Sequence, residues 1–173
     1  MASAWDRGEQ CTSAVIQPAG STTGGPVLWK NRDTDVLSNK VVFVDEQPYD
    51  YLCLANFDAP SGRSCWAGLN SEGFAIINTV AYNLPEPGGE MEDLEGLIMA
   101  DALRSCRTVA DFEAYLSANP GRDLGSLANF GVLDAEGGAV SAFAVEKGTP
   151  GLTVATASSR RSHSSRPNRA TPA

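Results

Sequence analysis

The chain has 173 residues, of which 42% are hydrophobic and 20% are charged, values typical of a single globular domain. Its apolar runs are short, as at residues 41–44, which excludes a transmembrane helix. The net charge of −8 argues against a general nucleic-acid-binding surface.

The charge is unevenly distributed along the chain. Residues 157–173 hold four of the 13 basic residues and no acidic one, so residues 1–156 carry a net charge of −12. The patterns typical of strands and helices end at Gly148, and the Ser- and Arg-rich sequence beyond it is predicted to be disordered. We expect three parts: a leader or propeptide at residues 1–10, a folded domain at 11–150, and a disordered basic tail at 151–173.

The first elements are predicted to be paired strands. Residues 11–17 and 27–31 are apolar and flank a segment rich in Gly, Pro, Ser and Thr, which indicates a hairpin. Residues 40–45 and 51–56 lie on either side of another turn and are expected to form a second pair. Further strands are expected at residues 65–69 and 74–81, with a turn at 70–73 between them.

The periodicity then changes to that of helices. Apolar side chains at helical spacing predict a helix at residues 94–107. Thr108 begins a second helix, and Asp111 follows it at the spacing of a capping box. A last hairpin is expected from strands at residues 128–133 and 139–146. Strands followed by two helices and then more strands predict an α+β fold with mostly antiparallel sheets.

The cysteine and histidine content limits the available chemistry. No two of the four cysteines have the spacing of a zinc site, and the single histidine, His163, lies in the tail. A Ser-His-Asp or Cys-His triad is therefore excluded for the folded body. Cys53 and Cys106 are expected to be small buried residues, and a disulfide between Cys53 and Cys65 stays open.

A nucleophilic enzyme without histidine needs another general base. An N-terminal nucleophile uses its own α-amine, which titrates at about pH 8 and is available in its neutral form near physiological pH. Cys11 fits this requirement, because it opens the first predicted strand directly after ten mostly polar residues that the fold does not need; either the chain cleaves itself between Gln10 and Cys11, or Met1 is not the true start.

Four segments support this hypothesis: residues 11–15 (CTSAV), 28–35 (LWKNRDTD), 66–79 (WAGLNSEGFAIINT) and 128–134 (ANFGVLD). In this order they resemble the Ntn (N-terminal nucleophile) hydrolases of the choloylglycine hydrolase and isopenicillin-N acyltransferase group, the peptidase C45-like branch. The resemblance spans about residues 11–146. It implies an αββα sandwich, of which this chain would form the N-terminal portion.

The resemblance also implies roles for five residues. Cys11, freed by autoproteolysis of the preceding peptide bond, would be both thiol nucleophile and amine base, and Asp33 would orient these two groups. Lys30 stands where many relatives carry arginine. Asn78 and Asn129 would donate hydrogen bonds to the tetrahedral oxyanion, and such a donor contributes about 3–4 kcal/mol in the transition state.

The implied activity is hydrolysis of a linear, non-peptide amide or transfer of its acyl group. The resemblance implies a small-molecule amide substrate and no metal or organic cofactor, and it leaves a homo-oligomer open. The net charge and the short apolar runs argue against nucleic acid and a membrane as partners. Residues 1–10 have no apolar stretch of signal-peptide length, which predicts a cytoplasmic protein, although relatives include exported ones. Because relatives are usually about twice as long, we expect a truncated or frameshifted product.

Two alternatives to an active enzyme stay open: a truncated, inactive fragment, and a small α+β binding module in which Cys11 is structural. In the module, Asp33 would cap a turn and Asn129 a strand end. Asn70 is expected to form the turn before Gly73 in either case. Core packing is favoured over pocket lining for the aromatic residues Trp29, Trp66 and Tyr82.

Overall fold

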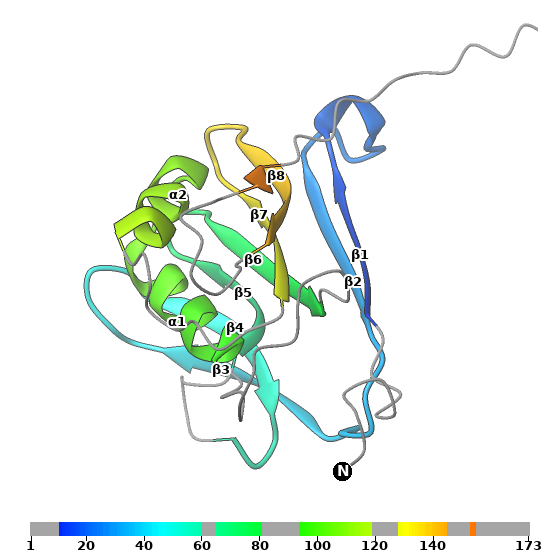
Figure 1. Cartoon of the computed structure of the whole chain (residues 1–173), viewed down its shortest axis with the longest axis vertical. Coiled ribbons are helices and arrows are strands. Elements are labelled where there is room, and N and C mark those ends of the chain that lie inside the picture. The colour runs from blue at the N-terminus through cyan, green and yellow to red at the C-terminus, as the bar shows by residue number, and fades with distance from the viewer. Residues whose placement is uncertain (1–10, 60–64, 81–93, 119–127, 145–152, 155–173) are drawn as a thin grey trace, which may run out of the picture.

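A computed structural model describes residues 11–59, 65–80, 94–118, 128–144 and 153–154 (Figure 1). They form two antiparallel sheets and two helices. The smaller sheet pairs β1 (Cys11–Ile16) with β2 (Val27–Arg32). The larger sheet contains, in spatial order, β3 (Asn39–Val44), β4 (Tyr51–Asn56), β5 (Cys65–Asn70), β6 (Ala75–Val80), β7 (Ala128–Leu133), β8 (Ala139–Ala144) and β9 (Thr153–Val154).

The predicted α+β class and the three predicted hairpins are confirmed. β1 pairs with β2, β3 with β4, and β7 with β8, all antiparallel. The predicted helices correspond to α1 (Glu95–Ser105) and α2 (Val109–Ala118). α1 ends earlier than the predicted residue 107, because the backbone of Cys106 is extended. Neither helix has the length and apolar character needed to cross a membrane, in the part of the chain that the structure describes.

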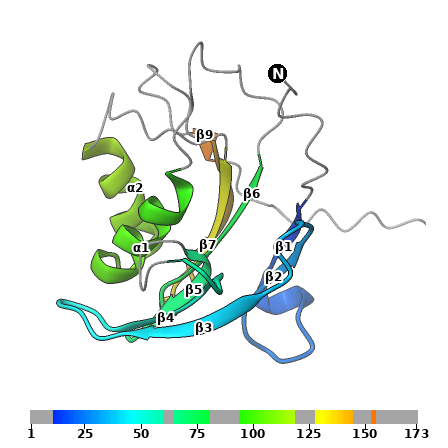
Figure 2. The same ribbon diagram turned by 90° about the horizontal axis from the view of Figure 1, so that it is seen from below.

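The elements stack in three layers (Figure 2). α1 and α2 cover one face of the larger sheet, and the β1–β2 sheet packs against part of the opposite face, where it contacts β6, β7 and β8. The hydrophobic core lies between the helices and the sheet and includes Phe74, Met99, Leu103, Phe112 and Phe130. Three aromatic rings from β7, α2 and the turn before β6 meet there, and the ring centroids of Phe112 and Phe130 lie 5.8 Å apart.

The predicted burial of two cysteines is confirmed, since Cys53 and Cys106 are each only 2% exposed. All four cysteines are free thiols. Cys53 and Cys65, for which a disulfide was left open, share a hydrogen bond between their thiols. This hydrogen bond and burial raise the pKa of Cys65 far above its usual value.

The part of the sheet that β1–β2 does not contact exposes apolar side chains. Four of them lie on the face opposite the helices: Val41 and Phe43 of β3, Leu52 of β4 and Leu69 of β5. Leu52 lies between the buried residues Tyr51 and Cys53, so it points away from the core. Phe43 and Leu69 pair with Leu52 across the strands, and Val41 is two residues from Phe43 on the same strand. Phe43, for example, is 63% exposed. The homo-oligomer that the resemblance leaves open stays open.

Two buried polar residues connect the turns to the helices. Asn70 donates from Nδ2 to the carbonyl oxygens of Leu103 and Cys106, at 2.8 and 2.7 Å, and so satisfies the C-terminal end of α1. Its Oδ1 accepts from the backbone N–H groups of Glu72 and Phe74, which forms the predicted turn. Asp134 accepts from the backbone N–H of Val109 at 2.9 Å and thereby ties the start of α2 to the turn after β7.

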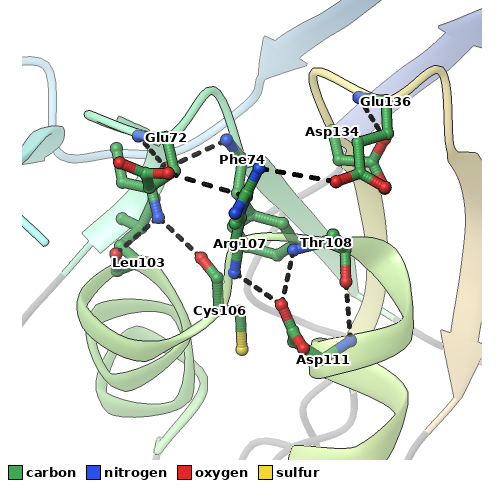
Figure 3. A network of polar contacts seen from close by, with 10 residues as sticks. Glu72, Phe74, Leu103, Cys106, Arg107, Thr108, Asp111, Asp134 and Glu136 are labelled. Atoms are coloured by element: carbon green, nitrogen blue, oxygen red, sulfur yellow. Dashed lines mark hydrogen bonds and ion pairs between the residues drawn. The ribbon is translucent and has the colours of Figure 1, made fainter. Parts of the chain in front are cut away.

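The predicted capping box at the start of α2 is confirmed. Asp111 accepts from the backbone N–H of Thr108 at 2.8 Å, and Thr108 Oγ1 accepts from the backbone N–H of Asp111 at 3.1 Å (Figure 3). Partial burial alone would raise the pKa of Asp111, but hydrogen bonds from Arg107 and Thr108 outweigh it and hold the pKa below its usual value.

This arrangement predicts a pH-dependent contribution to stability. A carboxyl whose pKa is lower in the folded chain stabilises that chain above its unfolded pKa of about 4, and the contribution is lost as the pH falls through the folded pKa. Asp111→Asn should therefore lower the midpoint of urea unfolding at pH 7 and have a smaller effect at pH 3. Glu113→Gln is the control, because Glu113 is a partly exposed carboxylate on the same helix. An equal effect of Asp111→Asn at both pH values would contradict the assignment.

The predicted leader at residues 1–10 lies outside the described residues, as does the predicted tail apart from Thr153 and Val154. These two residues form β9, which pairs with β8 through Phe143 and Ala144. A strand therefore occurs within the stretch after Gly148 where the sequence predicts no regular structure. Backbone pairing with a sheet edge places little demand on side chains, which is why composition does not reveal it.

Candidate active site

Cys11 is the first residue of β1 and is partly buried. It pairs across the sheet with Arg32 of β2. Side chains two residues apart on a strand point to the same face, so Lys30 lies on the same face of β2 as Arg32. The register thus makes Cys11 and Lys30 diagonal neighbours, with Cα atoms about 7–8 Å apart in such pairs, within reach of a lysine side chain.

Lys30 connects the smaller sheet to the larger one. Its Nζ donates to the backbone carbonyl of Trp66 at 3.2 Å and to Asn78 Oδ1 at 2.6 Å. Burial lowers the pKa of this ammonium from its usual value to about 8; the electrostatic influence of Cys11 and of Glu95 raises it and that of Arg32 lowers it, each by less than burial does. About a tenth of the Lys30 amine is thus neutral at pH 7.

A cavity of about 180 Å³ opens between these elements. Its polar lining comes from β1, β2 and the two residues after it, β4, β6 and the start of α1: Cys11, Lys30, Arg32, Asp33, Thr34, Asn56, Asn78, Thr79 and Glu95. Asn78, only 8% exposed, and Asp33, which is exposed, lie at different depths from the surface. The cavity therefore combines a thiol, an amine, a carboxylate and an amide within one small volume.

A second and larger cavity of about 450 Å³ shares part of its wall with the first. Both are lined by Lys30, Arg32, Thr34, Val36 and Trp66. The larger one adds mostly apolar side chains, including those of Leu28, Leu37, Leu54 and Ile77. A reacting group in the first cavity would thus have space beside it for an apolar substituent.

Trp66 forms the common wall. The Arg32 guanidinium lies 4.7 Å from the Trp66 ring centroid and the Lys30 Nζ lies 5.3 Å from it. Such cation–π contacts restrain both side chains and position them beside the cavity. The indole Nε1 of Trp66 and Oδ1 of Asn56 are buried, and neither has a hydrogen-bond partner among the residues that the structure describes.

The structure brings together four of the five residues proposed from the sequence. Cys11, Lys30, Asp33 and Asn78 line the same cavity. Asn129 is not among its lining residues; it is partly buried on β7, opposite Thr79, which does line the cavity. Its proposed role stays a prediction.

The expectation for the tryptophans was wrong. Trp29 is 49% exposed on the outer face of β2, and Trp66 lines both cavities rather than the core; Tyr82 lies outside the described residues. Trp66 escapes the core because the β4–β5 register shifts between Leu54 and Ala55, with Ala55 pairing with Cys65 and Leu54 with Ala67.

Sequence reasoning also missed Arg32 and Glu95. Arg32 carries one signal, since it follows Lys30 at strand spacing and must share its face. Glu95 carries none, because only the packing of α1 against the sheet brings it to the cavity. Within the described ranges, no group of three or more His, Cys, Asp or Glu side chains is placed to hold a metal ion.

No protein-family model and no curated protein matches this sequence.

Proposed function

We propose that the chain is a cysteine amidohydrolase or acyltransferase of the N-terminal nucleophile type, acting on a linear, non-peptide amide through Cys11. The observation that carries this proposal is the small cavity that Cys11, Lys30, Asp33 and Asn78 line together. The helix–sheet–sheet order of the described layers corresponds to three layers of the αββα sandwich, which we propose as the fold.

The proposed reaction begins after removal of residues 1–10. The freed α-amine of Cys11 takes the thiol proton, and the thiolate attacks the substrate carbonyl carbon. The C–N bond then breaks, the proton passes to the leaving amine, and a thioester to Cys11 remains. Water completes hydrolysis, whereas a second amine completes acyl transfer.

Asn78 is the best-supported oxyanion donor. Its Oδ1 accepts the hydrogen bond from Lys30, so the NH₂ end of the amide is the end available to a substrate oxygen. A neutral donor fixed in this way stabilises the developing negative charge without moving during the reaction. Asp33 would accept hydrogen bonds from the α-amine of Cys11, and Asn129 would act as a second donor.

Intact-mass analysis of the purified full chain tests the proposal. We expect loss of residues 1–10, followed by a single adduct with a haloacetamide, mapped to Cys11. Cys11→Ser should show neither processing nor adduct. Cys106→Ala is the matched control, because Cys106 is buried in the core outside the cavity and its removal should leave both results intact. A chain that keeps residues 1–10, or that takes no adduct at Cys11, contradicts the proposal.

A further inference from the structure

We infer that Lys30 accepts the proton of the Cys11 thiol while residues 1–10 are still attached, so that the two side chains form a thiolate–ammonium pair. This goes beyond the proposed function and does not require that any amide is turned over. It follows from the register of the β1–β2 sheet, the shared cavity and the two hydrogen bonds of Lys30.

The uncleaved chain lacks the base that the proposed reaction uses. The nitrogen of Cys11 is then part of a peptide bond and is not basic. The described residues contain no histidine, since the one histidine of the chain is residue 163. A thiol that reacts before cleavage must therefore pass its proton to another side chain, and Lys30 is the amine on its face of the sheet.

The hydrogen bonds of Lys30 suit this transfer. A neutral amine has two N–H groups and one lone pair, and Lys30 Nζ faces two acceptors, the carbonyl of Trp66 and Oδ1 of Asn78. Both acceptors stay satisfied while the lone pair is free to take a proton. After transfer, the ammonium gains a third N–H without losing either hydrogen bond.

The environment of Lys30 favours the neutral amine that this transfer needs. Burial lowers the pKa of Lys30 to about 8, so an amine that can take the proton is populated near neutral pH. Attraction to the Cys11 thiolate and to Glu95 of α1 favours the ammonium, whereas Arg32 of β2 opposes it. The other titratable groups lining the cavity are Asp33, after β2, and Cys65 of β5.

The step is balanced within the protein. The S–H bond of Cys11 breaks and an N–H bond forms at Lys30 Nζ, with no oxidant, reductant or further reactant. The thiolate is the reactive form of cysteine, so the pair predicts a Cys11 that reacts with electrophiles before the chain is processed.

The rate of alkylation of Cys11 by iodoacetamide tests the pair in the full chain. Intact mass separates uncleaved from cleaved molecules. In the wild type, trypsin then releases Cys11 in a peptide that ends at Lys30 and contains no other cysteine. In uncleaved Lys30→Met we expect a rate about tenfold lower at pH 7, with the pH of half-maximal rate about one unit higher. Lys30→Arg keeps a positive charge but cannot accept a proton, because its guanidinium stays protonated, so a wild-type rate in this variant would show that charge alone suffices and would overturn the transfer to Lys30.

Lys40→Met is the matched control. Lys40 is also partly buried and donates to a backbone carbonyl, that of Ala59 at 2.9 Å, but it lines neither cavity. Thermal unfolding is measured first, and Lys30→Gln, which retains hydrogen-bond donors but no proton acceptor, replaces Lys30→Met if that variant does not fold. The inference is overturned if folded Lys30→Met or Lys30→Gln alkylates Cys11 at the wild-type rate. It is also overturned if Lys40→Met lowers that rate as much as they do.

The result is independent of the proposed function. Slow alkylation in the neutral variants, together with retention of residues 1–10 in the wild type, would keep the thiolate–ammonium pair and reject the hydrolase. Normal removal of residues 1–10 together with unchanged alkylation rates in Lys30→Met and Lys30→Gln would reject the thiolate–ammonium pair and leave the proposed hydrolase standing.

Discussion

Asn70→Asp is expected to destabilise the folded chain by about 3–5 kcal/mol, although it changes the shape of the side chain very little. Asn70 is only 5% exposed, and its NH₂ group satisfies the carbonyls of Leu103 and Cys106. A carboxylate cannot donate to either carbonyl and places a negative charge against both. The carboxylate still accepts hydrogen bonds from the backbone N–H groups of Glu72 and Phe74. The wild type already has these two hydrogen bonds, so they do not offset the loss of the two donated to the carbonyls.

Urea unfolding at pH 7 measures this loss, and repeating it at pH 4 identifies its cause. Burial raises the pKa of a carboxyl, so the introduced group binds a proton in the folded chain at a higher pH than in the unfolded chain. The deficit relative to the wild type should therefore shrink as the pH falls. Asn39→Asp is the control, because Asn39 also donates to a carbonyl, that of Leu37 at 3.1 Å, but is exposed. A deficit no larger than that of the control would show that Asn70 is not a structural link.

Asn78→Asp is expected to lower kcat by about 100- to 1,000-fold for an amide that the processed enzyme hydrolyses, if the proposed function is correct. The substitution keeps an oxygen for Lys30, whose Nζ donates to Asn78 Oδ1 at 2.6 Å. It removes the NH₂ donor and adds a negative charge where the oxyanion develops. Because the contact with Lys30 is retained, the variant separates oxyanion stabilisation from the positioning of Lys30.

The comparison for this prediction is Asn31→Asp, the same change on the exposed outer face of β2 next to Lys30. It should leave kcat within about threefold, since a solvent-exposed charge is screened by water and salt. A similar loss of kcat in both variants would indicate a general electrostatic effect rather than a donor at Asn78. An Asn78→Asp enzyme with normal kcat would remove Asn78 from the reaction.

Local features of the sequence predicted the secondary structure well. The β1–β2 and β7–β8 hairpins follow from apolar segments separated by turn residues, and both are found. The capping box joins Thr108 to Asp111, so its residues are close in sequence before any tertiary structure forms. Signals of this kind need no knowledge of what the element packs against.

The face that each strand buries was harder to predict. In β3, residues 41–44 are all apolar, so no alternation indicates which side meets the core. The structure partly buries Val42 and Val44 against the core and leaves Val41 and Phe43 exposed. That choice depends on where α1, α2 and the β1–β2 sheet lie, which is a property of the assembled layers.

The sequence by itself determined the types of the elements before β9, the absence of histidine from the body, and five candidates, Cys11, Lys30, Asp33, Asn78 and Asn129. Only the tertiary structure decided that the first four of these line one cavity, that Lys30 holds Asn78, and that Trp66 and Glu95 complete the wall. The physical reason is sequence distance: Lys30 and Asn78 are 48 residues apart, and only the packing of the smaller sheet on the larger one brings them into contact.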